Sequence, residues 1–441
     1  ADYKAVCKSP RRALLGDRLF VPHAYPAGMH QTLGEPISLN RESQAIVDRV
    51  ADAIGPFLEE LADAIVSLHP RIVGFSSSFQ QTLAAAALAR ILKEKSPEIC
   101  LVLGGANAAM PMGGALMQVF PWFDHVFAGE ADVEFPAFCE RVLRDGHTSE
   151  PRLIVCEPVK DMSVVRAPDF SDYFASLRAY QQRGQLPADL PEFLPLESSR
   201  GCWWGEKHHC TFCGLNGETM TMRQKPAERV MEEVKETMRR WQPRRLQFAD
   251  NIMPMNYFKD LLPAFSRLSQ RPSLFYEVKA NLRDDQVETM ADAGIDAIQP
   301  GIESLSTNVL RLMRKGVSGP QNLALLRSCL SNNINVNWNY LFGFPGETAE
   351  DYERVLALLP LIEHLPAPNG LSKIIIDRFS PYHNDPAGFG IGRLSPFKAY
   401  YGLYPNGAPV SDIAYHFRGR YTTALIENAS LLAAFSGAID R

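Results

Sequence analysis

The fold is decided by Ser199-Arg200-Gly201-Cys202-Trp203-Trp204-Gly205-Glu206-Lys207-His208-His209-Cys210-Thr211-Phe212-Cys213-Gly214-Leu215-Asn216. Its three cysteines have the spacing C-x7-C-x2-C and directly follow a predicted strand at 194–198. A C-x2-C pair lets two thiolates converge on one centre, and the third thiolate arrives from the longer loop. Three thiolates fill three corners of an iron–sulfur cubane and leave the fourth iron open. A ligand that carries an amine and a carboxylate can chelate this open iron. The loop therefore predicts a [4Fe–4S] cluster held by Cys202, Cys210 and Cys213.

A structural zinc ion is the alternative for this loop, with His208 or His209 as the fourth ligand. Zinc fingers usually bring paired ligands on two short hairpins. The sequence has no second C-x2-C pair and no H-x3-5-H pair. The cluster is therefore the favoured interpretation.

The remaining cysteines are scattered singly, mostly within apolar segments, and we predict that they are small buried hydrophobic residues. Such a pattern in a chain of 441 residues is not a secreted disulfide framework. It fits a reducing compartment and predicts a cytoplasmic protein. These cysteines are Cys7, Cys100, Cys139, Cys156 and Cys329.

The composition is typical of a globular protein, with 46% hydrophobic and 22% charged residues. No apolar run approaches the roughly 20 residues that span a bilayer, and the first residues have no signal-peptide pattern. The net charge is -5 and no basic stripe is present. We therefore expect neither a membrane nor a nucleic acid as a partner.

The first half of the chain alternates strands and helices, which predicts a parallel sheet with helices on its faces. We expect an irregular segment at 1–45, an α/β domain at 46–145 and a linker at 146–190. The predicted strands of the domain are 72–75, 100–103 and 125–128, and its predicted helices are 45–68, 82–93, 112–119 and 134–143.

A second alternating series at 191–390 predicts a partial barrel of six βα units, followed by an extension at 391–441 with one helix near 421–435. In such barrels the chemistry gathers at the carboxyl ends of the strands. The predicted strands are 194–198, 245–248, 275–279, 297–300, 335–341 and 373–376. The predicted helices are 227–241, 257–268, 285–293, 305–313, 321–332 and 349–359.

The cysteine loop, the six βα units and Gly343-Phe344-Pro345-Gly346-Glu347-Thr348 together resemble the radical S-adenosylmethionine (SAM) superfamily. The cysteine spacing departs from the C-x3-C-x2-C usual there by four extra residues. The loop is also similar to that of the radical SAM C-methyltransferases that mature ribosomally made peptides (RiPPs). Three further segments are also similar to segments of those methyltransferases: Tyr276-Glu277-Val278-Lys279-Ala280-Asn281-Leu282, Gln299-Pro300-Gly301-Ile302-Glu303-Ser304-Leu305-Ser306 and Leu312-Met313-Arg314-Lys315-Gly316.

This resemblance implies an α/β fold with a Rossmann-like cobalamin-binding domain followed by a partial (β/α)6 radical SAM barrel. It implies methylation of an unactivated sp3 carbon of a ribosomal peptide. The implied cofactors are the [4Fe–4S] cluster, SAM and cobalamin in its methyl form. The implied partners are a precursor peptide and an external one-electron reductant of the flavodoxin or ferredoxin type.

By the same resemblance, polar residues at the strand ends and around the cluster would bind SAM. Thr211, Phe212 and Gly214 would touch the adenine, and the turn at 343–348 would pack on it. Glu303 and Ser304 would contact the ribose or the carboxylate, and Arg314 would pair with the carboxylate through its planar fork. The remaining residues of this set are Asp250, Asn251, Lys279, Gln299 and Asn339.

The resemblance also places cobalamin at the ends of the first three strands, where glycines let the backbone approach a ligand closely. The chain lacks the D-x-H-x-x-G motif that supplies a histidine to cobalt, as do the methyltransferases that it resembles. It also lacks a clear earlier strand–helix unit within residues 1–70. The serines have a second interpretation, as a cap for the helix at 82. The implied residues are Ser76, Ser77, Ser78, Phe79, Gln80, Gly104, Gly105, Asn107, Gly129 and Glu130.

Two other functions compete with this one. The first is a cobalamin-independent radical SAM reaction on a peptide, either epimerisation or thioether formation. An epimerase needs a hydrogen donor, so Cys329 or Cys156 would have to face the pocket. The second is a non-catalytic metal-binding module that recognises a peptide.

Overall fold

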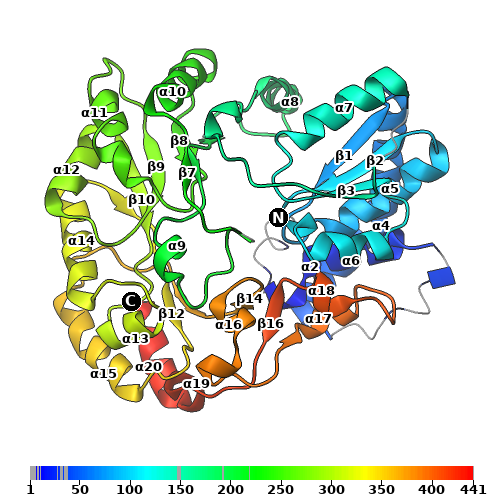
Figure 1. Cartoon of the computed structure of the whole chain (residues 1–441). Helices are drawn as coiled ribbons and strands as arrows, with labels where there is room; N and C mark the ends of the chain where they lie inside the picture. The colour runs from blue at the N-terminus through cyan, green and yellow to red at the C-terminus, as the bar shows by residue number, and fades with distance from the viewer. Residues whose placement is uncertain are drawn as a thin grey trace. The chain divides into compact units, whose positions relative to one another are not determined.

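The chain forms two compact units in a computed structural model (Figure 1). Unit 1 comprises Ala1–Val159 and Leu394–Arg418, and unit 2 comprises Lys160–Arg393 and Gly419–Arg441. The structure describes residues 6, 9, 11–26, 28–29, 33, 38–146, 150–190, 193–217 and 219–440. The prediction for Cys7 and parts of the predicted segments 1–45 and 146–190 lie outside these residues.

Unit 1 is built on a parallel sheet with the order β1-β2-β3-β4. Its strands are β1 (Ile72–Ser76), β2 (Cys100–Gly104), β3 (His125–Ala128) and β4 (Leu153–Val155). The connecting helices are α5 (Thr82–Lys95), α6 (Met112–Val119) and α7 (Glu134–Asp145), and α4 (Arg41–Ser67) precedes the sheet. The first three predicted strands and all four predicted helices are therefore confirmed, with small changes in their ends. Because the strands are parallel, their carboxyl ends meet at one edge of the sheet.

The alternation of side chains along the strands explains how the helices cover this sheet. Val102 and Phe127 point to one face, where they pack with Phe138 and Val142 of α7. The helix α6 lies against β3 and β4. A buried run such as His125–Ala128 is typical of a strand that is covered on both faces.

Two parts of the chain differ from the prediction for unit 1 and its flanks. The segment expected to be irregular carries η1 (Arg11–Ala13), α2 (Leu15–Arg18) and α3 (Val21–Ala24). The expected linker contains β4, η4 (Met162–Val164) and α8 (Ser171–Gln182). These elements are too short to show a hydrophobic period, except for α8, whose apolar face is narrow.

The predicted extension at 391–441 is divided between the two units. Its first part belongs to unit 1 and contains β15 (Ser395–Pro396), which pairs antiparallel with β16 (His416–Arg418). The short helices α17 (Lys398–Tyr401) and α18 (Val410–Ile413) lie between these strands, and η3 (Ala106–Ala108) is a further short helix of unit 1. The second part belongs to unit 2 and carries α19 (Ala424–Glu427) and α20 (Ala429–Ile439), in place of the one predicted helix.

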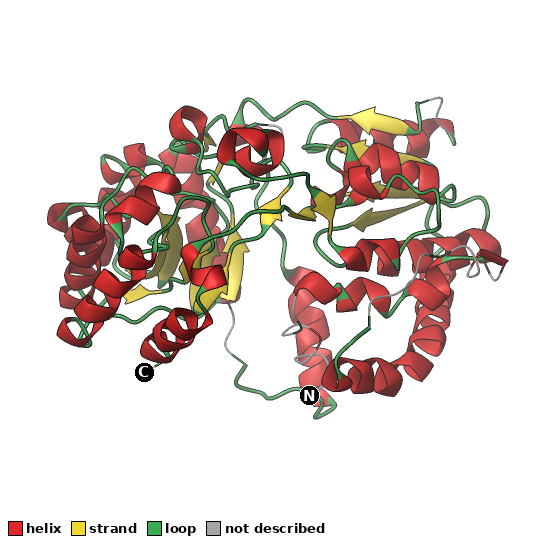
Figure 2. Cartoon of the chain, turned by 90° about the horizontal axis from the view of Figure 1, so that it is seen from below, coloured by secondary structure: helices red, strands yellow, loops and turns green. Residues whose placement is uncertain are grey.

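Unit 2 contains a parallel sheet with the order β11-β10-β9-β8-β5, and its helices gather on the outer side of the strands (Figure 2). The strands are β5 (Phe193–Leu196), β8 (Arg245–Phe248), β9 (Leu274–Val278), β10 (Ile295–Pro300) and β11 (Asn335–Val336). A parallel pair, β12 (Tyr340–Phe342) and β13 (Leu371–Lys373), follows, and the predicted strand 335–341 is thus two short strands. The expectation of an α/β fold with parallel sheets and a partial barrel is confirmed.

Helices between the strands complete the barrel repeat. They are α10 (Ala227–Trp241), α11 (Leu261–Ser266), α12 (Asp284–Asp292), α13 (Thr307–Leu312), α14 (Gly319–Ser331) and α15 (Ala349–Leu358). Short elements lie in the loops: β6 (Ser199–Arg200), α9 (Gly205–His208), β7 (Arg223–Gln224), η5 (Met255–Phe258), η6 (Leu359–Leu361), β14 (Ile376–Asp377), α16 (Pro381–Asn384) and η7 (Ala387–Phe389).

The core of unit 2 lies between the sheet and these helices. Leu246 and Phe248 of β8 and Leu274 and Tyr276 of β9 belong to it, together with Val234 of α10. The residues between them on each strand, such as Gln247 and Glu277, therefore point to the inner face. None of the described helices is both long enough and apolar enough to cross a membrane.

Candidate active site

The cysteine loop follows β5 at the carboxyl edge of the barrel sheet. A short antiparallel pair, β6 with β7, encloses it, and the Cys202 amide donates to the Met220 carbonyl at 3.0 Å. The residues after Cys202 form one helical turn, α9, whose first amide, from Gly205, donates to the Cys202 Sγ at 3.3 Å. The four extra residues of the C-x7-C spacing are therefore used to build a helical turn.

The three thiols lie close enough to influence one another electrostatically. Burial is the largest effect, and it raises the pKa of Cys210 and raises that of Cys213 to about 12. Neighbouring thiols raise both values further, whereas Lys315 lowers the pKa of each. The nearby lysines oppose the effect of burial and favour the thiolate form that a cluster requires of its ligands. The donor set of the loop thus fits a [4Fe–4S] cluster.

The two histidines of the loop have partners within the loop. The His208 ring packs on the Trp204 ring with centroids 4.3 Å apart, and His209 Nε2 lies 2.8 Å from the Cys213 carbonyl oxygen. Within the described part of the chain, no three His, Cys, Asp or Glu side chains are grouped so as to hold a single ion.

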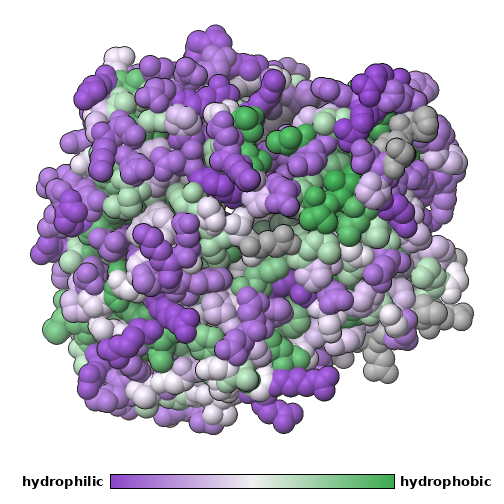
Figure 3. Space-filling view, viewed as in Figure 1, coloured by the Kyte–Doolittle hydropathy of each residue, from purple (hydrophilic) through white to green (hydrophobic). Residues whose placement is uncertain are grey.

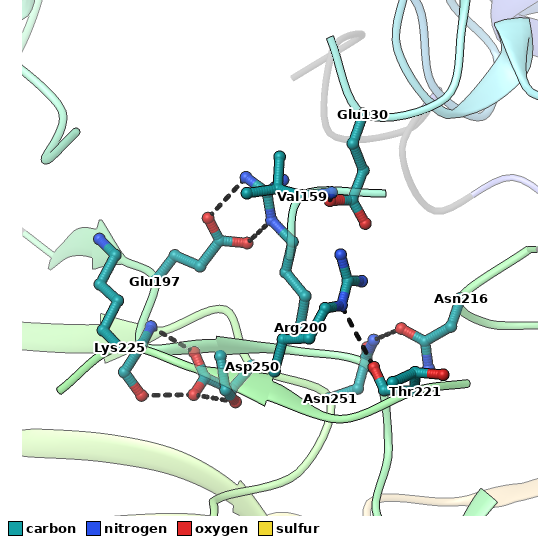
Figure 4. A network of polar contacts seen from close by, with 12 residues as sticks. Glu130, Val159, Glu197, Arg200, Asn216, Thr221, Lys225, Asp250 and Asn251 are labelled. Atoms are coloured by element: carbon teal, nitrogen blue, oxygen red, sulfur yellow. Dashed lines mark hydrogen bonds and ion pairs between the residues drawn. The ribbon is translucent and has the colours of Figure 1, made fainter. Parts of the chain in front are cut away.

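Asp250, at the end of β8, anchors the start of the cysteine loop (Figure 4). Its buried carboxylate accepts hydrogen bonds from the Ser198 amide (2.8 Å), the Ser198 hydroxyl (2.5 Å) and the Ser199 hydroxyl (2.7 Å). Burial raises the pKa of Asp250 to about 6, and these hydrogen bonds oppose that rise. Beside it, Arg200 donates two hydrogen bonds to Glu197 at 2.7 and 2.9 Å. Together, these contacts fix the backbone just before Cys202.

Two lysines face the loop: the buried Lys279, just after β9, and the half-buried Lys315, in the turn after α13. Lys279 Nζ lies 3.9 Å from the centroid of the Trp204 ring and donates to the Lys315 carbonyl. Lys315 Nζ lies 3.3 Å from Glu303 Oε1. Burial lowers the pKa of Lys279 to about 8, and Lys315 lowers it further. The sequence signal for Lys315 was its place between Arg314 and Gly316, but only Arg314 was predicted as a contact.

Four of the predicted SAM-binding residues already use their side chains inside the protein. Asp250 is one, and the buried Thr211 hydroxyl donates to the Leu312 carbonyl at 3.2 Å. The buried Ser304 hydroxyl lies 3.0 Å from the Tyr340 hydroxyl, and Asn251 Nδ2 donates to Asn216 Oδ1 at 2.5 Å. We therefore assign these four side chains to positioning the loops around the site.

The other predicted SAM-binding residues lie around the same strand ends. Gln299 and Asn339 are exposed, and Gln299 pairs in register with Glu277 on the inner face. The exposed Arg314 guanidinium lies 5.2 Å from the Phe389 ring. The remaining ones are Phe212, whose ring meets Phe344 edge-on at 5.7 Å, the buried Gly214, and the Lys279 and Glu303 described above.

Two carboxyl groups at this site were not among the predicted ligands. Glu277 makes no side-chain hydrogen bond within the described residues, and burial raises its pKa to about 7, with Glu303 the next cause. Glu347 is buried and holds the Gly343–Thr348 turn, since its Oε2 accepts from the Gly343 and Phe344 amides at 2.9 Å each. The Phe212–Phe344 contact brings that turn beside the cysteine loop.

In unit 1, the predicted cobalamin residues gather at the carboxyl edge of the sheet. Ser77 is buried, and its hydroxyl lies 3.1 Å from the Thr82 hydroxyl and accepts from Asn107 Nδ2 at 3.0 Å. Gln80 accepts from the Gly16 amide, and Ser78 donates to Gln81. The serines do not cap α5; the Leu83 amide donates instead to Asp17 Oδ1 at 2.9 Å.

Two glycines, Gly105 and Gly129, lie at the same edge. Gly105 has a φ of 89°, and a Cβ there would lie 2.6 Å from the Ser77 carbonyl oxygen. Gly129 has a φ of 113°, and a Cβ there would lie 2.5 Å from the Cys156 oxygen. Both glycines and the neighbouring Ser76 are exposed, while Gly104 is half-buried and Glu130 accepts from the Val159 amide at 2.9 Å.

Large apolar side chains are exposed at these strand ends as well. Phe79 after β1, Val133 after β3 and Val155 at the end of β4 are each more than half exposed. Apolar side chains gather over the strands of unit 1 in the space-filling view (Figure 3). A bare backbone beside apolar side chains is the character expected of a ligand site.

The structure describes four of the scattered cysteines. Cys329 is fully buried in the core of unit 2, and Cys156 is buried in the core of unit 1, as predicted. Cys100 and Cys139 are only half-buried. The epimerase alternative therefore finds no hydrogen donor in Cys329 or Cys156.

Residues 196–359 match the radical SAM superfamily, so the part of the barrel that carries the three cysteines is a radical SAM domain. The fold and the site thus define a radical SAM enzyme, a class that takes a [4Fe–4S] cluster and SAM. One relative is an uncharacterized methyltransferase of Pyrococcus horikoshii, 22% identical over 329 residues. The match covers 70% of this chain and 68% of the relative.

Two solved structures share the fold of the chain. One is the radical SAM methyltransferase TsrM from Kitasatospora setae, solved with tryptophan and a SAM analogue, with a TM-score of 0.63 and 14% identity. That match covers 90% of this chain and 84% of TsrM. The other is the cobalamin-dependent SAM radical enzyme OxsB with aqua-cobalamin bound, with a TM-score of 0.59 and 15% identity. The chain covers 58% of the length of OxsB, and the match covers 84% of this chain.

Proposed function

We propose that the protein is a cobalamin-dependent radical SAM C-methyltransferase that methylates an unactivated sp3 carbon of a ribosomal peptide. The observation that carries the proposal is the loop with Cys202, Cys210 and Cys213, which follows β5 at the carboxyl edge of a parallel barrel sheet and whose thiols are close enough to couple electrostatically. The second parallel sheet, in unit 1, has a glycine-lined carboxyl edge of its own. The likeness to TsrM and OxsB supports this combination.

In this proposal the chain binds and shields its cofactors. When bound, the cluster, SAM and cobalamin supply one-electron cleavage chemistry and a methyl group for transfer to carbon. The three cysteines hold the cluster, and Lys279 and Lys315 place positive charge beside their sulfurs. The exposed Gln299 and Asn339, with Glu303, offer hydrogen bonds to the polar groups of SAM. Orienting the reactants in this way is the main task of the protein.

Cobalamin would lie at the carboxyl edge of the unit 1 sheet. Gly105 and Gly129 are exposed at that edge, and Ser76 is its exposed serine hydroxyl. Phe79, Val133 and Val155 offer apolar contact to it. Ser77 and Asn107 hold the loop after β1 in place instead of presenting free groups. These residues fit a ligand with a broad ring that offers apolar contact and with polar groups at its edge.

The substrate and the setting rest on the sequence resemblance. We propose a precursor peptide as the substrate, a flavodoxin or ferredoxin as the electron donor, and the cytoplasm as the compartment. The inner face of the barrel carries Glu277, whose carboxyl group can pair with peptide amides.

The test is to purify the protein without oxygen, reconstitute it with iron, sulfide and hydroxocobalamin, and measure bound iron and cobalamin after desalting. We expect about four irons and about one cobalamin per chain. Cys213→Ser should lose the iron, whereas the control Cys139→Ser, on α7, should keep it. Iron without cobalamin would contradict the cobalamin part of the proposal, and zinc in place of iron would overturn it entirely.

A further inference from the structure

The carboxyl end of helix α13 and the turn after it, residues Leu312–Gly316, lie directly against the cysteine loop. A helix leaves its last carbonyl groups without partners inside the helix. Here the loop supplies partners: the Thr211 hydroxyl donates to the Leu312 oxygen at 3.2 Å, and the Thr211 amide donates to the Met313 oxygen at 3.1 Å. Thr211 stands between Cys210 and Cys213, so these two bonds fix the second half of the loop.

The next two carbonyls of the same turn hold the first half of the loop. Trp204 Nε1 donates to the Arg314 oxygen at 3.0 Å, and Lys279 donates to the Lys315 oxygen. The Lys279 ammonium also sits 3.9 Å from the Trp204 ring centroid, in cation–π contact. Four consecutive carbonyl oxygens, from 312 to 315, therefore all accept hydrogen bonds from the loop or from the lysine packed on it.

Gly316 makes room for this arrangement. Its φ is 63°, which favours glycine, and a Cβ there would lie only 2.1 Å from the far edge of the Trp204 ring. The Trp204 ring therefore rests on the bare backbone of Gly316. The ring of His208, also in the loop, packs on the Trp204 ring with centroids 4.3 Å apart.

We infer that the Leu312–Gly316 turn supports the loop that carries the three cysteines. Trp204 is the positioning residue, because it holds the seven-residue spacer between Cys202 and Cys210 against this turn. A spacer of this length must be held in one conformation before it can offer its sulfurs in a fixed geometry. Gly316 then controls the loop although it contacts no cysteine. The inference rests on the proposed role of the cysteines as cluster ligands, but it concerns their positioning alone.

The test compares Gly316→Ala with Gly184→Ala in the full chain. Gly184 has a φ of 68°, close to that of Gly316, and a Cβ there would meet nothing within 4 Å, so this control carries the backbone strain without the clash. In the metal-free protein, we expect Gly316→Ala to speed the alkylation of Cys202 and Cys210 by iodoacetamide by about tenfold through local opening. Gly184→Ala should leave these rates unchanged, and the buried Cys329 should stay unreactive in both variants.

A double variant separates the clash from general strain. Trp204→Ala should also speed the alkylation, and adding Gly316→Ala to it should change the rate by less than about twofold, because the ring that collides is gone. Full additivity of the two effects, or an unchanged rate in either single variant, would overturn the inference. If Gly316→Ala fails to fold, Trp204→Ala alone decides the question.

The reconstituted protein gives a second readout that simple loss of stability would not move. Gly316→Ala and Trp204→Ala should both lower the midpoint potential of the cluster, because the Lys279 charge that favours the added electron is no longer held on the loop. Unchanged potentials in both variants would contradict the inference. Because alkylation is measured without iron or cobalamin, failure of the methyltransferase proposal would leave that result standing.

Discussion

At the scale of single residues, Asp250 shows how a buried carboxylate organises this site without offering a free group. We predict that Asp250→Ala lowers the free energy of unfolding of unit 2 by about 3 kcal/mol, because three buried donors on Ser198 and Ser199 lose their acceptor. Urea unfolding measures the change. Asp250→Asn keeps one acceptor oxygen and should lose less, and the exposed Asp292→Ala should lose almost nothing. Equal stabilities of Asp250→Ala and the unsubstituted chain would refute this role.

The half-buried carboxyl group of Glu277 should make the stability of the fold depend on pH. Burial raises its pKa from 4.5 to about 7, so the folded state holds the proton that the unfolded state releases first. The stability from this group is complete below pH about 4.5 and is lost as the pH rises through about 7. Glu277→Gln should therefore gain thermal stability over the unsubstituted chain at pH 8 and little at pH 5, by at most about 3 kcal/mol. Melting curves at the two pH values, with the exposed Glu288→Gln as the control, check this. An equal gain at both values would contradict it.

At the scale of elements, α2 supplies the cap that α5 lacks in its own sequence. The Asp17 carboxylate accepts from the Leu83 amide, and Asp17 is buried. Asp17→Ala should destabilise unit 1 by about 1–2 kcal/mol, the usual effect of losing a cap. Hydrogen exchange at Leu83 should quicken in this variant, while Asp17→Asn keeps an acceptor and should protect that amide. Unchanged exchange in Asp17→Ala would show that the cap is dispensable.

The longer elements were predictable because each carries a period that the chain displays over a dozen residues. The amphipathic helix α10 was predicted with its observed ends, and β2 and β3 were found as buried apolar runs between turn residues. The helix α2 has four residues and gains its place from one carboxylate that reaches a distant helix. No local pattern encodes such a contact, so the order within residues 11–24 was missed.

The site was predictable to a similar degree. The cysteine spacing located the loop, and the strand alternation located the edge on which it lies. The partners of Thr211 and Trp204 are backbone carbonyls 101 and 110 residues away in the chain, and a carbonyl has no residue identity to read. Burial also decides whether a polar side chain such as Ser304 is free or already bonded, and burial depends on the folded core.

At the scale of the whole molecule, each unit carries its own parallel sheet and its own candidate cofactor edge, so the two cofactors should be separable by mutation. Gly105→Ala places a Cβ 2.6 Å from the Ser77 carbonyl oxygen and so pushes apart the loops after β1 and β2 at the carboxyl edge of unit 1. We predict that it lowers bound cobalamin at least about tenfold while bound iron is unchanged, because the clash with Ser77 displaces the exposed backbone on which cobalamin would lie. Cys213→Ser should lower bound iron and leave bound cobalamin unchanged.

The matched control for this separation is Gly407→Ala in unit 1. Gly407 has a φ of 90°, close to the 89° of Gly105, but a Cβ there would meet nothing within 4 Å. It therefore carries the same backbone strain without obstructing the sheet edge, and both cofactors should bind to it normally. If Gly105→Ala and Gly407→Ala lose cobalamin equally, strain in unit 1 explains the loss and the edge at Gly105 is not the binding surface. If Gly105→Ala loses iron together with cobalamin, the two cofactors depend on each other and cannot be assigned to one unit each.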